Sequence, residues 1–155
     1  MFHFGTQVTD RMESKSEIEA VVARVSEFTK STEMKEVKVG EIPILLVKTP
    51  TEFYAVGSRC THYGAPLIKG VVQGERVVCP WHGACFNLSN GDIEDAPALD
   101  PIEKYSLRIS GDEILVRVPA GATGRRQPAF CRADPGNRKT IVVVGAGAAG
   151  LVCFP

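Results

Sequence analysis

The feature that most constrains this chain is a pair of short Cys/His segments, each lying where a predicted strand ends. The first is Cys60-Thr-His62 and the second is Cys79-Pro-Trp-His82, with sixteen residues between His62 and Cys79. Thiolate and imidazole are side chains that bind transition metals well. Two such segments predict that four side chains from two loops hold one metal centre.

A cluster of two irons needs the donor set that these segments provide. In a [2Fe–2S] cluster, two sulfides bridge the irons and each iron takes two further ligands. Loops that approach from opposite sides can give both thiolates to an inner iron and both imidazoles to an outer iron. We therefore predict that Cys60, His62, Cys79 and His82 hold one [2Fe–2S] cluster, which transfers single electrons.

Two other kinds of metal site use similar ligands: a structural zinc site and a catalytic mononuclear iron. Zinc also accepts two cysteines and two histidines. In zinc fingers, however, one segment usually carries both cysteines and the other, on a helix, both histidines. Here each segment mixes the two residue types, so a zinc-stabilised Cys2His2 binding module without a redox role is the alternative. A catalytic mononuclear iron needs two further histidines and a carboxylate, and only His3 lies outside the two segments.

Short apolar segments punctuated by glycine and proline predict an all-β domain over residues 18–120. Residues 35–39 alternate between polar and apolar, whereas residues 42–48 form an almost continuous apolar run. Residues 20–28 fit either a strand or a short helix. Further strands are predicted at residues 53–56, 76–79, 84–88, 104–109 and 114–118.

Charge and composition narrow the class of partner and the compartment. Eighteen basic and eighteen acidic residues leave no basic excess to attract nucleic acid. Residues 1–17 are expected to form a flexible tail without a secretory leader. The longest apolar run is shorter than the ~20 residues that span a bilayer. We expect a monomer inside the cell, cytoplasmic or mitochondrial, with no nucleic-acid partner and no membrane span.

The segments Cys60-Thr-His-Tyr-Gly64 and Cys79-Pro-Trp-His-Gly83 resemble the two cluster-binding loops of Rieske proteins. The resemblance covers residues 18–120. It implies a fold of three small antiparallel β-sheets, with the cluster-binding loops at one tip. It also implies a third, proline-containing loop over the cluster, which Ala96-Pro97-Ala98 matches. Tyr63 and Trp81 are candidates to shield the cluster from water.

Four positions depart from the Rieske proteins of respiratory complexes. Those proteins form a disulfide where this chain has Ala65 and Trp81, and they hydrogen-bond the cluster sulfurs where it has Ala84 and Phe86. Hydrogen bonds to sulfur favour the reduced cluster. The resemblance thus implies a potential toward the negative end of the Rieske range of roughly −150 to +300 mV. Such ferredoxin-type domains take electrons from NAD(P)H-linked flavoproteins.

The end of the sequence carries a second motif. Residues 121–140 are predicted to be a linker, and residues 141–155 look like the first strand and glycine loop of an FAD-binding domain, with Gly145, Gly147 and Gly150. The order of domains resembles apoptosis-inducing factor-like flavoprotein oxidoreductases. The motif has no second strand after it, so we expect FAD only in a full-length relative, an FAD-dependent oxidoreductase. The expected partner is a redox protein or flavin domain.

Overall fold

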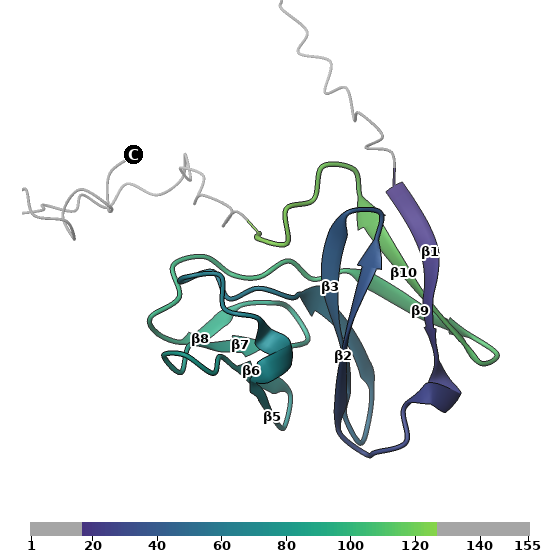
Figure 1. The fold of residues 1–155 in the computed structure, drawn as a ribbon, viewed down its shortest axis with the longest axis horizontal. Coiled ribbons are helices and arrows are strands. Elements are labelled where there is room, and N and C mark those ends of the chain that lie inside the picture. The colour runs from purple at the N-terminus through teal and green to yellow at the C-terminus, as the bar shows by residue number, and fades with distance from the viewer. Residues whose placement is uncertain (1–16, 127–155) are drawn as a thin grey trace, which may run out of the picture.

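The computed structural model describes residues 17–126. Residues 1–16 of the predicted tail, residues 127–140 of the predicted linker and the glycine motif at Gly145, Gly147 and Gly150 lie outside the described residues. Within the described part, ten strands form three antiparallel sheets (Figure 1). The predicted all-β architecture of three small sheets is therefore confirmed. No helix among residues 17–126 is long and apolar enough to cross a membrane.

The three sheets differ in size and in strand order. The first sheet has the order β1-β10-β9 and consists of β1 (Glu17–Arg24), β10 (Glu113–Pro119) and β9 (Ser106–Ser110). The second has the order β2-β3-β4 and consists of β2 (Glu33–Val39), β3 (Ile42–Lys48) and β4 (Phe53–Gly57). The third has the order β5-β6-β7-β8 and consists of β5 (Val71–Gln73), β6 (Arg76–Val78), β7 (Cys85–Asn87) and β8 (Ile93–Asp95).

The second sheet is the middle layer of the molecule, and its strand β3 is buried on both faces. Ile44 and Leu46 belong to the core shared with the first sheet. Leu45 and Val47 point the opposite way, into the core shared with the third sheet. None of these four side chains is exposed to solvent. Two-sided burial explains why residues 42–48 are a continuous apolar run rather than an alternating one.

The second core lies directly beneath the predicted cluster loops. It contains Cys60 and Cys79 together with Phe86, Leu88 and Ile102. All five are at most 4% exposed. The rigid packing of a protein interior therefore fixes the two cysteines on which the predicted metal centre depends.

Two strands were not predicted from the sequence. β5 and β8 have three residues each and lie at the two edges of the third sheet. A strand this short carries no measurable periodicity, so its existence depends on pairing with β6 and β7. The ambiguous segment 20–28 contains both alternatives: β1 ends at Arg24, and a 3-10 turn, η1 (Val25–Glu27), follows.

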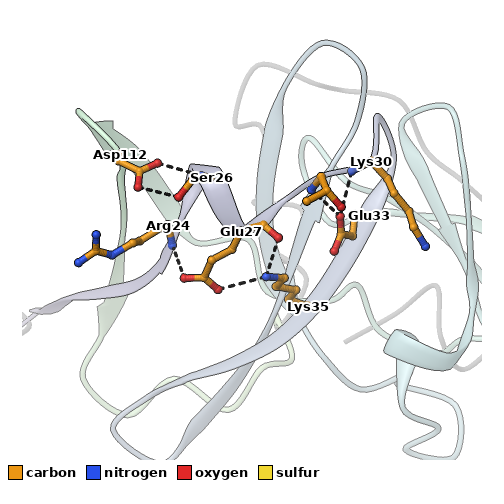
Figure 2. Close-up of polar contacts among 8 residues, drawn as sticks. Arg24, Ser26, Glu27, Lys30, Glu33, Lys35 and Asp112 are labelled. Carbon is orange, nitrogen blue, oxygen red and sulfur yellow. Dashed lines mark hydrogen bonds and ion pairs between the residues drawn. The ribbon is translucent and has the colours of Figure 1, made fainter.

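A polar network holds η1 against its neighbours (Figure 2). The backbone N–H and the hydroxyl of Ser26 each donate to the Asp112 carboxylate at 2.8 Å. The Lys35 ammonium lies 3.1 Å from the Glu27 carboxylate. These contacts lower the pKa of Asp112, through its hydrogen bonds to Ser26, and that of Glu27, chiefly through Lys35. They join η1 to the β9–β10 turn and to β2.

Residues 120–126, which we call the C-terminal strap, fold back onto the domain. Sequence composition placed residues 121–126 in the linker, yet the Gly124 carbonyl accepts a hydrogen bond from Glu103 N–H at 3.0 Å, and Arg126 N–H donates to Pro101 at 3.1 Å. A Cβ on Gly57 would lie 2.2 Å from the Gly124 oxygen, so only glycine admits the strap at this point. The strap glycines, Gly121 and Gly124, both have a φ of 78°, a left-handed conformation that glycine adopts at little cost.

Leu46→Ala should lower the free energy of unfolding by about 2–5 kcal/mol, because it leaves a cavity in the middle of a core. Val21→Ala is the matched control: this side chain is 52% exposed on β1, and its loss should cost about 0.5 kcal/mol or less. Urea denaturation followed by circular dichroism measures both. Equal losses for the two variants would contradict the two-sided burial of β3.

Candidate metal centre

The first cluster loop, Cys60 to Ala65, is closed by two backbone hydrogen bonds. Cys60 N–H donates to the Ala65 carbonyl at 2.9 Å, and Gly64 N–H donates back to the Cys60 carbonyl at 2.8 Å. Gly64 has a φ of 74°, in the left-handed region. Glycine adopts this conformation at little cost, which explains its place four residues after the cysteine.

The second cluster loop, Cys79 to Ala84, repeats this hydrogen bonding between β6 and β7. Cys79 N–H donates to the Ala84 carbonyl at 2.8 Å, and Gly83 N–H donates to the Cys79 carbonyl at 3.2 Å. Gly83 has a φ of 76°. The two loops therefore have the same backbone structure, although the first carries its histidine two residues after the cysteine and the second three residues after it.

The fold brings the four predicted ligands together as two pairs. The thiols of Cys60 and Cys79 are free, only 2% and 4% exposed, and close enough to interact. The rings of His62 and His82 lie outside them, with centroids 4.9 Å apart and planes at 76°. His62 is half-buried and His82 is exposed. The centre thus has a buried sulfur side and an outward imidazole side.

The surroundings of the Cys60 sulfur favour its binding to a metal ion. Burial raises the pKa of the Cys60 thiol, and the neighbouring Cys79 thiol raises it further. The backbone N–H groups of His62 and Tyr63 hydrogen-bond the sulfur and lower this pKa. A metal that binds the thiolate removes the cost of burying its charge, while the N–H groups remain in place as donors to the sulfur.

The arrangement fits a group that takes two ligands at each of two metals. Among residues 17–126, no three His, Cys, Asp or Glu side chains gather around a single point. The His62 Nδ1 atom is buried and has no hydrogen-bond partner in the described part of the chain. Two thiols and two imidazoles, one of which has an unsatisfied ring nitrogen, are the donors that a [2Fe–2S] cluster of mixed ligation uses.

The remaining predicted neighbours divide into buried and exposed groups. Ala98 of the third loop packs against the core that holds the two cysteines. Tyr63 and Trp81 are 70% and 57% exposed, so neither packs in the core. The Tyr63 ring lies 4.0 Å from the His62 ring, centroid to centroid. Tyr63 therefore covers one face of His62 while remaining open to solvent.

Cys85 is a third buried free cysteine, and it lies outside the predicted ligand set. Its free thiol is 3% exposed and lies on β7, directly after the second cluster loop. Burial raises the pKa of this thiol, and the nearby carboxylates of Glu94 and Asp95 raise it further. Cys85 is therefore a buried, protonated core residue.

Sequence reasoning missed three residues that lie around the first cluster loop: Thr61, Asp100 and Arg125. Arg125 donates to the Thr61 carbonyl at 3.2 Å and pairs with the Asp100 carboxylate at 3.2 Å. Sixty-four positions separate Arg125 from Thr61. No local pattern marks such a contact, because it exists only once the C-terminal strap has folded back.

Comparison with protein families gives one match, which covers more than half of the chain. The sequence model of the Rieske [2Fe–2S] domain matches residues 19–106. This range contains both cluster loops and the third loop. It ends before β10 and the C-terminal strap.

Relatives of two kinds are similar to this chain. Apoptosis-inducing factor 3 of Homo sapiens is 44% identical over 143 residues, which are 88% of this chain and 24% of the relative. The chain thus spans about a quarter of that relative's length. The 3-phenylpropionate/cinnamic acid dioxygenase ferredoxin subunit of Escherichia coli K12 is 35% identical over 77 residues, which are 49% of this chain and 73% of that protein.

A solved structure extends the likeness to the fold. A chain in the complex of reduced oxygenase and oxidized ferredoxin in carbazole 1,9a-dioxygenase superposes with a TM-score of 0.60 and 26% identity, covering 72% of this chain and 98% of that one. Ferredoxin relatives, the family match and the paired thiols and imidazoles agree on one cofactor and one activity. The chain belongs to the Rieske [2Fe–2S] domain family, and it transfers electrons through a Rieske-type [2Fe–2S] cluster.

Proposed function

We propose that Cys60 and Cys79 bind the inner iron of the cluster and that His62 and His82 bind the outer iron. The observation that carries this assignment is the pairing itself: two adjacent buried thiols lie beneath two adjacent, outward imidazoles. Both cysteines start loops with the same backbone hydrogen bonds, so each loop can deliver one thiolate and one imidazole.

The cluster supplies reversible one-electron chemistry, and the protein residues set the conditions for it. The core around Cys60 and Cys79 excludes water from the sulfur side. The exposed ring of His82 offers the shortest route for an electron between the domain and a partner. The two closed loops keep the ligands fixed, so that little reorganisation accompanies a change of charge.

We further propose a low potential for this domain. The positions of Ala84 and Phe86 are fully buried and carry no hydroxyl group that could donate to a cluster sulfur. A hydrogen bond of ~1 kcal/mol to the reduced state raises a one-electron potential by roughly 40 mV. The absence of two hydroxyl groups at these positions therefore supports a potential below about +100 mV, within the lower half of the Rieske range.

The partner that suits such a domain is a flavoprotein reductase or a flavin domain of the same protein. Two relatives of this chain support a redox partner: Apoptosis-inducing factor 3, of which the chain spans 24%, and a ferredoxin whose structure was solved in complex with its oxygenase. We propose that the domain is monomeric, works inside the cell in the cytoplasm or mitochondrion, and either precedes a flavin domain or acts as a separate carrier.

Substitution of two buried cysteines, one in each variant, tests the ligand assignment. Cys79→Ala should abolish the iron and acid-labile sulfide content and the reduced-state electron paramagnetic resonance (EPR) signal of mixed Cys/His ligation, because the inner iron loses a thiolate. Cys85→Ala is the matched control: it removes an equally buried thiol from the adjoining strand and should leave the signal intact.

Either of two results would contradict the assignment. The first is a Cys79→Ala chain that retains the full signal, and the second is a Cys85→Ala chain that loses it. Zinc analysis of the same wild-type sample distinguishes the alternative, since one zinc and no sulfide would indicate a Cys2His2 zinc module.

Ala84→Ser should raise the midpoint potential by roughly 40 mV if its hydroxyl donates to a cluster sulfur. Redox titration of the wild-type chain and the variant, followed by EPR, measures the change. The wild-type value should lie below about +100 mV. A higher wild-type value, together with no change in the serine variant, would show that missing hydroxyl groups do not set the potential.

A further inference from the structure

Arg125 of the C-terminal strap connects two loops that border the cysteine and histidine pairs. Its Nη2 atom donates to the Thr61 carbonyl oxygen in the first cluster loop at 3.2 Å. Its Nη1 atom lies 3.2 Å from a carboxylate oxygen of Asp100, which follows the third loop. Thr61 is itself buried, and its hydroxyl donates to the Asp100 backbone carbonyl. The three residues therefore form a closed set of contacts.

Backbone contacts fix the position from which Arg125 reaches this loop. Arg125 pairs with Ile102 in an isolated antiparallel bridge, and the strap residues on either side of it hydrogen-bond to Glu103 and Pro101. The next side chain, Arg126, forms an ion pair with Asp92. Because the strap is held along its length, the Arg125 guanidinium needs little further ordering to meet the Thr61 carbonyl.

The contact acts on a peptide group that also touches the metal centre. The Thr61 carbonyl and the His62 N–H belong to the same peptide unit, and the His62 N–H hydrogen-bonds the Cys60 sulfur. A hydrogen bond from a cation to a carbonyl polarises the peptide unit and strengthens the bond that its N–H donates. A continuous path therefore runs from the Arg125 guanidinium to the Cys60 sulfur.

We propose that Arg125 is a positioning residue for the iron–sulfur cluster, which acts through the Thr61–His62 peptide group to hold an N–H donor against the Cys60 sulfur. This inference rests on the proposed role of Cys60 as a cluster ligand. The donor and the positive charge both stabilise the reduced cluster, which carries one more negative charge. Arg125 therefore raises the midpoint potential, and it slows cluster loss because it fixes the first loop.

A purely structural role for Arg125 predicts a different result. The Arg125 and Asp100 side chains are 53% and 29% exposed, and an ion pair at such a surface contributes little to folding by itself. Removal of a simple surface pair would leave the midpoint potential unchanged. The potential is therefore the measurement that separates positioning of the cluster from general stabilisation of the fold.

The experiment compares three variants of the full chain, each with its cluster reconstituted. Arg125→Gln removes the charge and the simultaneous contact with the Thr61 carbonyl and the Asp100 carboxylate. Arg125→Lys keeps the charge without the planar guanidinium. Arg117→Gln is the matched control, because Arg117 is an equally exposed arginine of the first sheet that pairs with Glu17 and Glu19. Redox titration gives the potential, and the decay of visible absorbance with a chelator gives the rate of cluster loss.

We expect Arg125→Gln to lower the potential and to lose its cluster about tenfold faster than the wild-type chain. The potential and the rate of cluster loss of Arg125→Lys should lie between those of Arg125→Gln and of the wild type. Arg117→Gln should match the wild type in both measurements. An Arg125→Gln chain with the wild-type potential would overturn the proposal. So would a variant that loses its β-structure by circular dichroism, since Arg125 would then be a residue of fold stability.

The wild-type chain separates this proposal from the one on which it rests. A wild-type chain without a cluster signal would refute the ligand assignment itself. A wild-type chain with a normal signal, beside an Arg125→Gln chain of unchanged potential, would refute only the role of Arg125.

Discussion

The structure depends on a middle sheet that is buried on both faces. β3 sends alternate side chains into two separate cores, one shared with the first sheet and one that contains Cys60 and Cys79. Each core is closed by a different outer sheet. The first cluster loop follows β4 of the middle sheet and the second joins β6 to β7 of the third sheet, so the core that contains Cys60 and Cys79 gives both loops a rigid base.

The candidate metal centre combines a dry side and a wet side, and both are needed for electron transfer. Under the proposed ligand assignment, the buried thiols would keep the iron–sulfur core away from water, whereas the exposed ring of His82 would give a partner access to it. Aromatic side chains leave this edge open: Tyr63 touches His62 but is itself largely exposed. Electron entry and cluster protection are thus separated within two loops of the same backbone structure.

The C-terminal strap links a late segment of the chain to the first cluster loop. The family match ends at residue 106, and the strap begins fourteen residues later. Gly57 allows the strap to approach β4 closely, and Arg125 then reaches the first cluster loop. The strap is thereby connected to the loop that carries Cys60 and His62.

The sequence by itself determined the ligand pattern, the all-β class and most strands, because these follow from local spacing and from alternating or continuous apolar runs. Tertiary structure decided what local spacing cannot encode. It placed β5 and β8 at the sheet edges, left Tyr63 and Trp81 exposed, and folded residues 121–126 onto the domain. The edge strands depend on pairing with β6 and β7. The strap depends on partners far along the chain, as Arg125 depends on Thr61, and such contacts exist only after the sheets have packed.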